Sequence, residues 1–167
     1  MTSDLIRVVL ADDHTVVRAG LKAVLGTAKD IDVVGEAKDG REAISLVDRF
    51  KPDVVVMDLS MAGMDGTAAT KEIVAKGLST RVLILTMHPE EDYLVPLLEA
   101  GAAGYLVKSA ADRELVDAVR AVAKGDVYVR PTAARVLAKG LTKKDPHQVD
   151  RERFEKRLAE HPFTDED

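Results

Sequence analysis

Val54-Val55-Val56-Met57 is a continuous apolar run that ends on a carboxylate, Asp58. An unbroken apolar run of this length, with turn residues on both sides, predicts a strand buried on both faces of a parallel sheet. Ligands of open parallel sheets bind outside the carboxyl ends of the strands. Asp58 is therefore expected at an edge of the sheet, where it can take part in chemistry.

Further short apolar runs alternate with segments whose apolar residues recur at helical spacing, as do Val16, Val17 and Leu21 in the first of them. The expected strands are 7–11, 31–37, 54–58, 81–86 and 104–107, and the expected helices are 15–28, 40–50, 67–76, a segment after the acidic residues 90–92, and 109–124. Pro96 predicts that the fourth helix begins late or is irregular, because proline removes a helix hydrogen bond. Asp112 is expected to cap the last helix.

This alternation predicts an α/β fold, namely a doubly wound, five-stranded parallel sheet of the flavodoxin-like kind with helices on both faces. The strand 31–37 carries Asp32 and Glu36, and a charged strand fits best at a sheet edge. The strand order 2-1-3-4-5 meets this condition. It also brings the carboxyl ends of the first and third strands side by side.

The composition limits the partners of the chain. Its net charge of −5 and the absence of an obvious basic patch make the chain itself a poor nucleic-acid binder. Cysteine is absent, which excludes disulfides and thiolate metal sites. No signal pattern precedes residue 8, and no apolar run approaches the roughly 20 residues of a membrane span. We expect a cytoplasmic protein that does not contact membranes.

The domain organisation is predicted as a compact domain at 1–125 and a partly helical linker at 126–167. Within the linker, residues 127–129 are expected to be extended, 131–141 and 151–161 helical, and 142–148 linker-like. The last residues, 164–167, resemble the capped start of another helix. We therefore expect that the chain ends where a second domain begins.

Polar side chains stand at the carboxyl ends of the expected strands. Asp12 and Asp13 follow the first strand, and Asp58 ends the third. Three carboxylates at one place repel one another unless a cation joins them, and an all-oxygen set suits a hard ion such as Mg²⁺. Thr86 and Lys108 follow the fourth and fifth strands, where a hydroxyl and an ammonium could bind phosphoryl oxygens. Each alone would be an ordinary cap or surface residue, but together they predict phosphoryl transfer to a carboxylate.

These five polar residues, with the loop 61–66 (MAGMDG), resemble the signature of the receiver domain of two-component response regulators. The resemblance covers residues 5–125. The runs 11–14 (ADDH) and 100–108 (AGAAGYLVK) further resemble the subfamily with a LuxR-type helix-turn-helix output. This subfamily likeness implies transcriptional control, with DNA bound only through an output domain that is not in these residues.

The resemblance implies that Asp58 accepts phosphate from a partner histidine kinase. It implies that Asp13, Asp58 and the Ser60 carbonyl hold Mg²⁺, with Asp12 acting directly or through water. It also implies that self-phosphorylation and self-dephosphorylation are only weak partial reactions of a switch, so that the domain is not an enzyme in its own right.

The same resemblance implies that Thr86 and Lys108 bind the phosphoryl oxygens and that Tyr105 packs differently as Thr86 moves. Phosphorylation adds charge and acceptors, which biases a surface with two states. That surface is expected to include the helix with Pro96, the fifth strand and the last helix. A homodimer through the first and last helices, or through the face formed by 96–124, is a further expectation.

Some positions depart from the usual family pattern or are open to interpretation. Ala62 and Ser109 stand where proline is common in the family. Ser60 and His88 are expected to border the path of attacking water and so to tune the lifetime of the phosphate. His14 is read as local structure and not as a metal ligand, since hard Mg²⁺ prefers oxygen.

Three alternatives stay open. An aspartate-nucleophile phosphatase would need a second acid two residues after the nucleophile, where this chain has Ser60. A flavodoxin-like flavin carrier would need a phosphate cradle where Asp12 and Asp13 would repel phosphate. A receiver-like interaction module that is never phosphorylated would not need the complete acid set.

Overall fold

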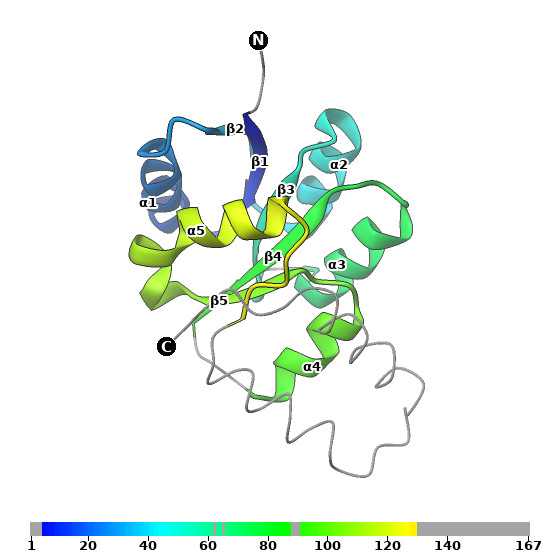
Figure 1. The fold of residues 1–167 in the computed structure, drawn as a ribbon. Helices are drawn as coiled ribbons and strands as arrows, with labels where there is room; N and C mark the ends of the chain where they lie inside the picture. Colours follow the sequence, from blue (N-terminus) through cyan, green and yellow to red (C-terminus); the bar gives the residue numbers. More distant parts are fainter. Residues whose placement is uncertain (1–4, 62, 65, 88–90, 130–167) are drawn as a thin grey trace.

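The computed structural model describes residues 5–61, 63–64, 66–87 and 91–129. Five parallel strands form one sheet in the order β2-β1-β3-β4-β5 (Figure 1), as the sequence predicted. The strands are β1 (Ile6–Ala11), β2 (Ile31–Ala37), β3 (Val54–Asp58), β4 (Arg81–Thr86) and β5 (Gly104–Val107). Every residue of β3 is buried, which fits its continuous apolar run, and the charged strand β2 lies at the edge.

The helices cover both faces of the sheet (Figure 1). They are α1 (Thr15–Gly26), α2 (Gly40–Phe50), α3 (Gly66–Ala75), α4 (Glu91–Glu99), the 3-10 turn η1 (Lys108–Ala110) and α5 (Ala111–Ala123). Alternate strand residues feed two separate core clusters. One cluster joins the sheet to α1 and α5, and the other joins it to α2, α3 and α4. The strands β3 and β4 are therefore buried on both faces, and the polar residues Asp58 and Thr86 stand at their carboxyl ends.

Details of three helices differ from the sequence prediction. Asp112 does not cap α5: the cap is Ala110, at the end of η1, and Asp112 lies in the first turn, where a carboxylate favours the helix dipole. Helix α4 begins at Glu91 and runs through Pro96, whose carbonyl still accepts from Ala100 N at 2.9 Å. Of the two outcomes predicted from the proline, a late or an irregular helix, the late start is wrong. In α1, Val16 is 84% exposed, because it lies off the stripe that faces the core.

The packed part of the chain continues beyond α5. Tyr105 N donates to Tyr128 O, and Tyr128 N donates to Ala103 O, both at 3.0 Å. The Tyr128 hydroxyl donates to Glu114 Oε1 at 2.8 Å, and residues 127–129 are buried. This segment, which the sequence predicted to be extended, covers the free edge of β5. The predicted helices at 131–141 and 151–161 and the linker at 142–148 lie outside the described residues, where we assign no structure.

Among the helices of the described part, none is long and apolar enough to cross a membrane.

Candidate functional site

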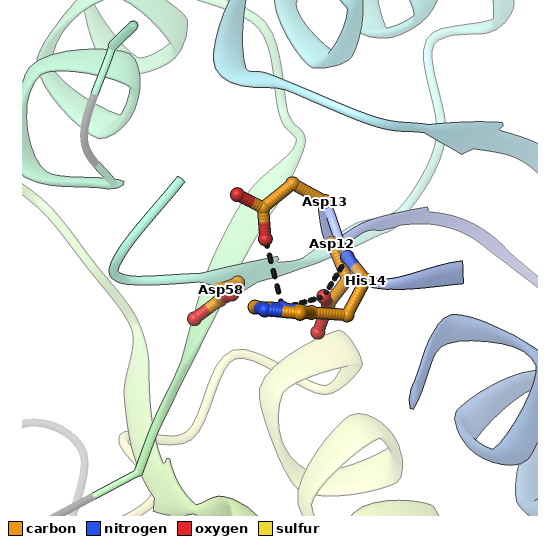
Figure 2. Close-up of side chains that lie close together, drawn as sticks. All are labelled: Asp12, Asp13, His14 and Asp58. Carbon is orange, nitrogen blue, oxygen red and sulfur yellow. Dashed lines mark hydrogen bonds and ion pairs between the residues drawn. The ribbon is translucent and has the colours of Figure 1, made fainter. Parts of the chain in front are cut away.

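The acidic residues meet at the carboxyl edge of the sheet because β1 and β3 are neighbours. Ala11, the last residue of β1, pairs with Met57, so Asp12 follows one strand beside the point where Asp58 ends the other. Figure 2 shows the side chains of Asp12, Asp13, His14 and Asp58 gathered there. One ligand atom from each of the four lies within 4.8 Å of all the others.

A single lysine contacts two of these acids. Lys108 Nζ lies 2.9 Å from Asp12 Oδ2 and 3.1 Å from Asp58 Oδ2. The three side chains are 10%, 0% and 3% exposed, respectively, so this is a buried charge cluster. Lys108 reaches the cluster because β5 ends at Val107 and the chain turns into η1 at the same edge of the sheet.

The charges in this cluster are not balanced. Burial raises the pKa of Asp58, and the charge of Asp12 adds to that effect, while the Lys108 ammonium opposes it. Burial acts to lower the pKa of Lys108, but hydrogen bonding and charge from Asp12 and Asp58 together raise it above its ordinary value. The lysine is therefore held as a cation, and the carboxylates remain in excess. Such a site favours a further cation.

The loop after β1 is held in place by backbone contacts of Asp12. Asp12 N donates to Ala37 O at 3.0 Å, and the Arg18 guanidinium donates from Nη1 to Asp12 O at 2.6 Å. Arg18 Nε donates in turn to Glu36 Oε1 at 3.2 Å. Arg18 was not predicted from the sequence as a positioning residue. Its place one turn into α1 was the available signal, but the direction of a long side chain is not encoded in spacing.

The segment after β3 folds back closely over Asp58. Ser60 N donates to Asp58 Oδ1 at 3.2 Å, and Gly66 N donates to Leu59 O at 2.8 Å. A Cβ on Gly66 would lie 2.9 Å from Leu59 Cα, closer than real side chains come to backbone atoms, and 3.0 Å from Asp58 O. Glycine at this position lets α3 begin directly beside the acid.

The donor set fits a hard divalent ion. Asp12 is fully buried, and its Oδ1 accepts from His14 N at 2.8 Å. Asp12 Oδ2 pairs with the Lys108 ammonium at 2.9 Å, and Asp58 Oδ2 shares that ammonium. Buried carboxylate oxygens in excess of their donors are the ligands that Mg²⁺ prefers. Asp12, Asp13 and Asp58 could hold it from three sides.

The remaining predicted site residues occupy the neighbouring strands. Thr86 ends β4, directly after Leu85, which pairs with Asp58, and it is 5% exposed. Tyr105 in β5 is also buried, in the cluster on the face with α4. Both lie at positions consistent with the sequence prediction. His88 lies outside the described residues.

Fold and site together define a class of protein. A doubly wound sheet in the order 2-1-3-4-5, with three acids and one lysine at its carboxyl edge, is the arrangement of a receiver domain.

Comparison with known proteins gives the family. Residues 8–120 match the response regulator receiver domain, and the chain belongs to this family. LiaR of Bacillus subtilis (strain 168), a transcriptional regulatory protein, is 40% identical over 156 residues, which are 93% of this chain and 74% of LiaR. The oxygen regulatory protein NreC of Staphylococcus carnosus (strain TM300) is 47% identical over 126 residues, 75% of this chain and 58% of NreC.

A solved structure agrees. The crystal structure of a two-component response regulator of the LuxR family from Aurantimonas sp. SI85-9A1 is 37% identical in sequence and superposes with a TM-score of 0.77. The match covers 83% of this chain and 99% of that one. Residues 8–120 thus form the receiver domain of a two-component response regulator, and the relatives of the chain include transcription regulators.

Proposed function

We propose that the domain is a phosphorylation-controlled switch in which Asp58 accepts a phosphoryl group from a histidine kinase. The observation that carries this proposal is the buried contact between Asp58 Oδ2 and Lys108 Nζ at 3.1 Å. A carboxylate oxygen of Asp58 attacks phosphorus, the phosphorus–nitrogen bond of the kinase phosphohistidine breaks, and the imidazole leaves. Lys108 stabilises the negative charge that gathers on the transferring oxygens.

Mg²⁺ would be held by Asp12, Asp13, Asp58 and the Ser60 carbonyl. When bound, it supplies charge neutralisation between the carboxylates and the phosphoryl oxygens. The support is the excess of buried carboxylate oxygen over donors in the described residues. Arg18 is a positioning residue, because it holds the main chain of Asp12 and so fixes the direction of the acid.

The phosphorylated state would be read through Thr86, Lys108 and Tyr105. A phosphoryl group on Asp58 gives the Thr86 hydroxyl a charged acceptor, and a shift of Thr86 changes the space available to Tyr105. Both side chains are buried, so neither can move without repacking its neighbours. The surface that carries the change would consist of α4, β5 and α5. Ser60 and His88 are proposed to tune the lifetime of the phosphate.

The output is proposed to be transcriptional, through a LuxR-type DNA-binding domain outside these residues. The support is the similarity to LiaR and to a LuxR-family regulator. The chain spans 74% of LiaR and 58% of NreC, so the activity of a whole regulator is inferred from these relatives. We propose a receiver at residues 1–125 and a linker at 126–167, the first residues of which pack against β5. A cytoplasmic location and association as a homodimer are part of the same proposal.

The experiment is labelling with a small-molecule phosphodonor and Mg²⁺, followed by an assay for an acid-stable but hydroxylamine-labile acyl phosphate. Wild type should be labelled, and Asp58→Asn should not. Asp53→Asn is the matched control, since this acid accepts from Arg7 N at 2.8 Å at the opposite end of β3. Equal labelling of Asp58→Asn, or no label on wild type, would leave a receiver that only mediates contacts.

A further inference from the structure

Residues 127–129, the edge segment, run beside β5 after the end of α5 (Figure 1). Tyr128 forms a parallel bridge with Gly104, in which Tyr105 N donates to Tyr128 O and Tyr128 N donates to Ala103 O. The three residues of the segment are 2%, 6% and 0% exposed. The edge segment is therefore packed as part of the domain, although it follows the last helix.

Alternate residues of the edge segment belong to opposite faces of the sheet. Val127 and Val129 belong to the core cluster that also holds Tyr105 and two leucines of α4. Tyr128 belongs to the other cluster, together with residues of α5. The edge segment therefore joins all three elements of the proposed switching surface, namely α4, β5 and α5.

One side-chain hydrogen bond holds the edge segment to α5. The Tyr128 hydroxyl donates to Glu114 Oε1 at 2.8 Å, and Glu114 lies in the first turn of that helix. A hydrogen bond to a carboxylate is stronger than one between neutral groups. The position of the edge segment thus depends on this bond as well as on the two main-chain bonds to β5.

From these contacts we infer that phosphorylation of Asp58 loosens the edge segment from β5, which passes the state of the receiver to the chain that follows. The inference rests on the proposed function, in which a shift of Thr86 changes the space available to Tyr105. The Tyr105 ring shares a close-packed cluster with both valines of the segment, so its movement leaves their packing incomplete. The Tyr105 amide is bonded to the same segment, so main chain and side chain act on it together.

Coupling of this kind is reciprocal. If a phosphoryl group on Asp58 favours the loosened segment, then weakening the segment must favour the phosphorylated state by the same factor. Tyr128→Phe removes the hydroxyl that bonds Glu114 and keeps the aromatic ring in its cluster. The loss of this bond should raise the population of the loosened segment by about tenfold. A residue that only stabilises the fold would not change the affinity for a phosphoryl group.

The experiment combines amide hydrogen exchange with titration of beryllium fluoride, a noncovalent mimic of a phosphoryl group on a carboxylate, in the full chain with Mg²⁺. In wild type, beryllium fluoride should speed exchange of the Tyr105 and Tyr128 amides by about fivefold or more. The Ala103 amide, which donates to Val82 O of β4 at 2.7 Å, should change little. Tyr128→Phe should speed the same two exchange rates without the mimic, and should bind the mimic more tightly by up to about tenfold.

Variants of α5 provide the controls. Glu114→Ala should reproduce both effects of Tyr128→Phe, and the double variant should add little, because one hydrogen bond is lost in each case. Glu114→Gln keeps an oxygen that can accept from Tyr128, so its affinity for the mimic should stay near that of wild type. Asp117→Ala removes the same charge from the same helix at a side chain that is 75% exposed, and it should change neither readout.

The outcomes separate this inference from the proposed function. If wild type binds beryllium fluoride but the exchange of both tyrosine amides is unchanged or slower, the inference is overturned and the phosphorylation switch stands. If Tyr128→Phe speeds exchange but binds the mimic as wild type does, the hydroxyl only stabilises the fold, and the inference is again overturned. If wild type neither binds the mimic nor is labelled on Asp58, the proposed function and this inference fail together.

Discussion

The ammonium of Lys108 lies 3.1 Å from the carboxylate of Asp58, and the two side chains are 10% and 3% exposed. The same ammonium also contacts Asp12, so one cation serves two buried acids. Burial still raises the pKa of Asp58, because one shared lysine does not replace the lost hydration. The site is therefore electrostatically unfavourable until a ligand completes it, which is a property suited to a switch.

Replacing the phosphoacceptor should stabilise the folded domain. The pKa of Asp58 is raised in the folded state, so its contribution to stability is complete below the unfolded pKa and is lost as pH rises through the folded pKa. At pH 7 without metal, Asp58→Asn should raise the thermal midpoint by about 2–4 °C. The gain should shrink on acidification below the ordinary pKa of aspartate.

Thermal unfolding followed by circular dichroism, at pH 7 and at a pH below the ordinary pKa of aspartate, measures this effect. Asp32→Asn, an exposed acid on the edge strand β2, makes the same charge change and should alter the midpoint little. A lower midpoint for Asp58→Asn at pH 7 would contradict the argument from burial.

Removing the lysine should have the opposite effect. Lys108→Met leaves Asp12 and Asp58 buried without their cation. Because removing one partner of a buried ion pair leaves an uncompensated charge, this variant should lower the free energy of unfolding by about 3 kcal/mol. Lys76→Met is the matched control, because Lys76 pairs with Asp48 at 2.9 Å between side chains that are 31% and 54% exposed. It should cost no more than about 1 kcal/mol.

Urea unfolding at pH 7 gives both values. The double variant with Asp58→Asn should recover part of the loss from Lys108→Met, since one unpaired charge is gone. If Lys108→Met and Lys76→Met lower the free energy of unfolding by the same amount, solvent screens the charges of the acidic site as effectively as it screens charges at the surface.

Glu36 pairs with Arg18 and Lys22, and its contribution to the free energy of unfolding should depend on pH. Hydrogen bonding from Lys22 lowers the pKa of Glu36 most, burial opposes it, and Arg18 adds to the lowering. A lowered folded pKa contributes stability above the unfolded pKa and loses it as pH falls through the folded value. Glu36→Gln should therefore cost up to about 1 kcal/mol at pH 7, given a side chain that is one-third exposed, and nothing at low pH.

The measurement is urea unfolding of Glu36→Gln and of wild type, from pH 7 down to a pH at which Glu36 is protonated in the folded state. Asp32→Asn, on the same strand, serves as the control for general charge effects. A cost that persists unchanged at low pH would show that Glu36 acts through packing and not through its charge.

Much of the fold follows from local pattern. The bounds of β3, β4 and β5 agree with the apolar runs, because buried strands of a parallel sheet need apolar residues at nearly every position. The bounds of β2 also agree with the prediction, although this strand carries two exposed acids. The charged residues of β2 indicated an edge strand, a condition that the order 2-1-3-4-5 meets. The grouping of Asp12, Asp13 and Asp58 followed from that order, since adjacent parallel strands end at one edge.

Features that depend on the orientation of a side chain, or on the path of the chain in the folded domain, could not be predicted from the sequence pattern. The bond from Arg18 to the carbonyl of Asp12 depends on how a long side chain turns, and the bond from Tyr128 to Glu114 depends on where the chain goes after α5. Asp112 was assigned as a cap because its residue type suits one, but η1 places the start of α5 at another residue. His14 was judged for magnesium alone, so its place among the acids was not anticipated.

Two glycines should respond oppositely to alanine. A Cβ on Gly104 in β5 would lie 2.7 Å from Leu83 Cδ1 and 3.2 Å from both Tyr128 O and Val122 Cγ2. Gly104→Ala should therefore cost about 1–3 kcal/mol by overpacking, and it should loosen the segment that covers β5. Gly20 lies within α1 with nothing within 4 Å of its Cβ position, so Gly20→Ala should stabilise by roughly 0.4–1 kcal/mol.

Urea unfolding gives the two energies, and amide hydrogen exchange locates the first effect. The Tyr105 amide donates to Tyr128 O, so its exchange should accelerate in Gly104→Ala by more than the global loss of stability requires. Gly20→Ala should slow exchange throughout the domain without singling out Tyr105. If Gly104→Ala is neutral and Tyr105 stays protected, residues 127–129 can shift without disturbing β5, and the strand next to Lys108 is not tied to the chain that leaves the receiver.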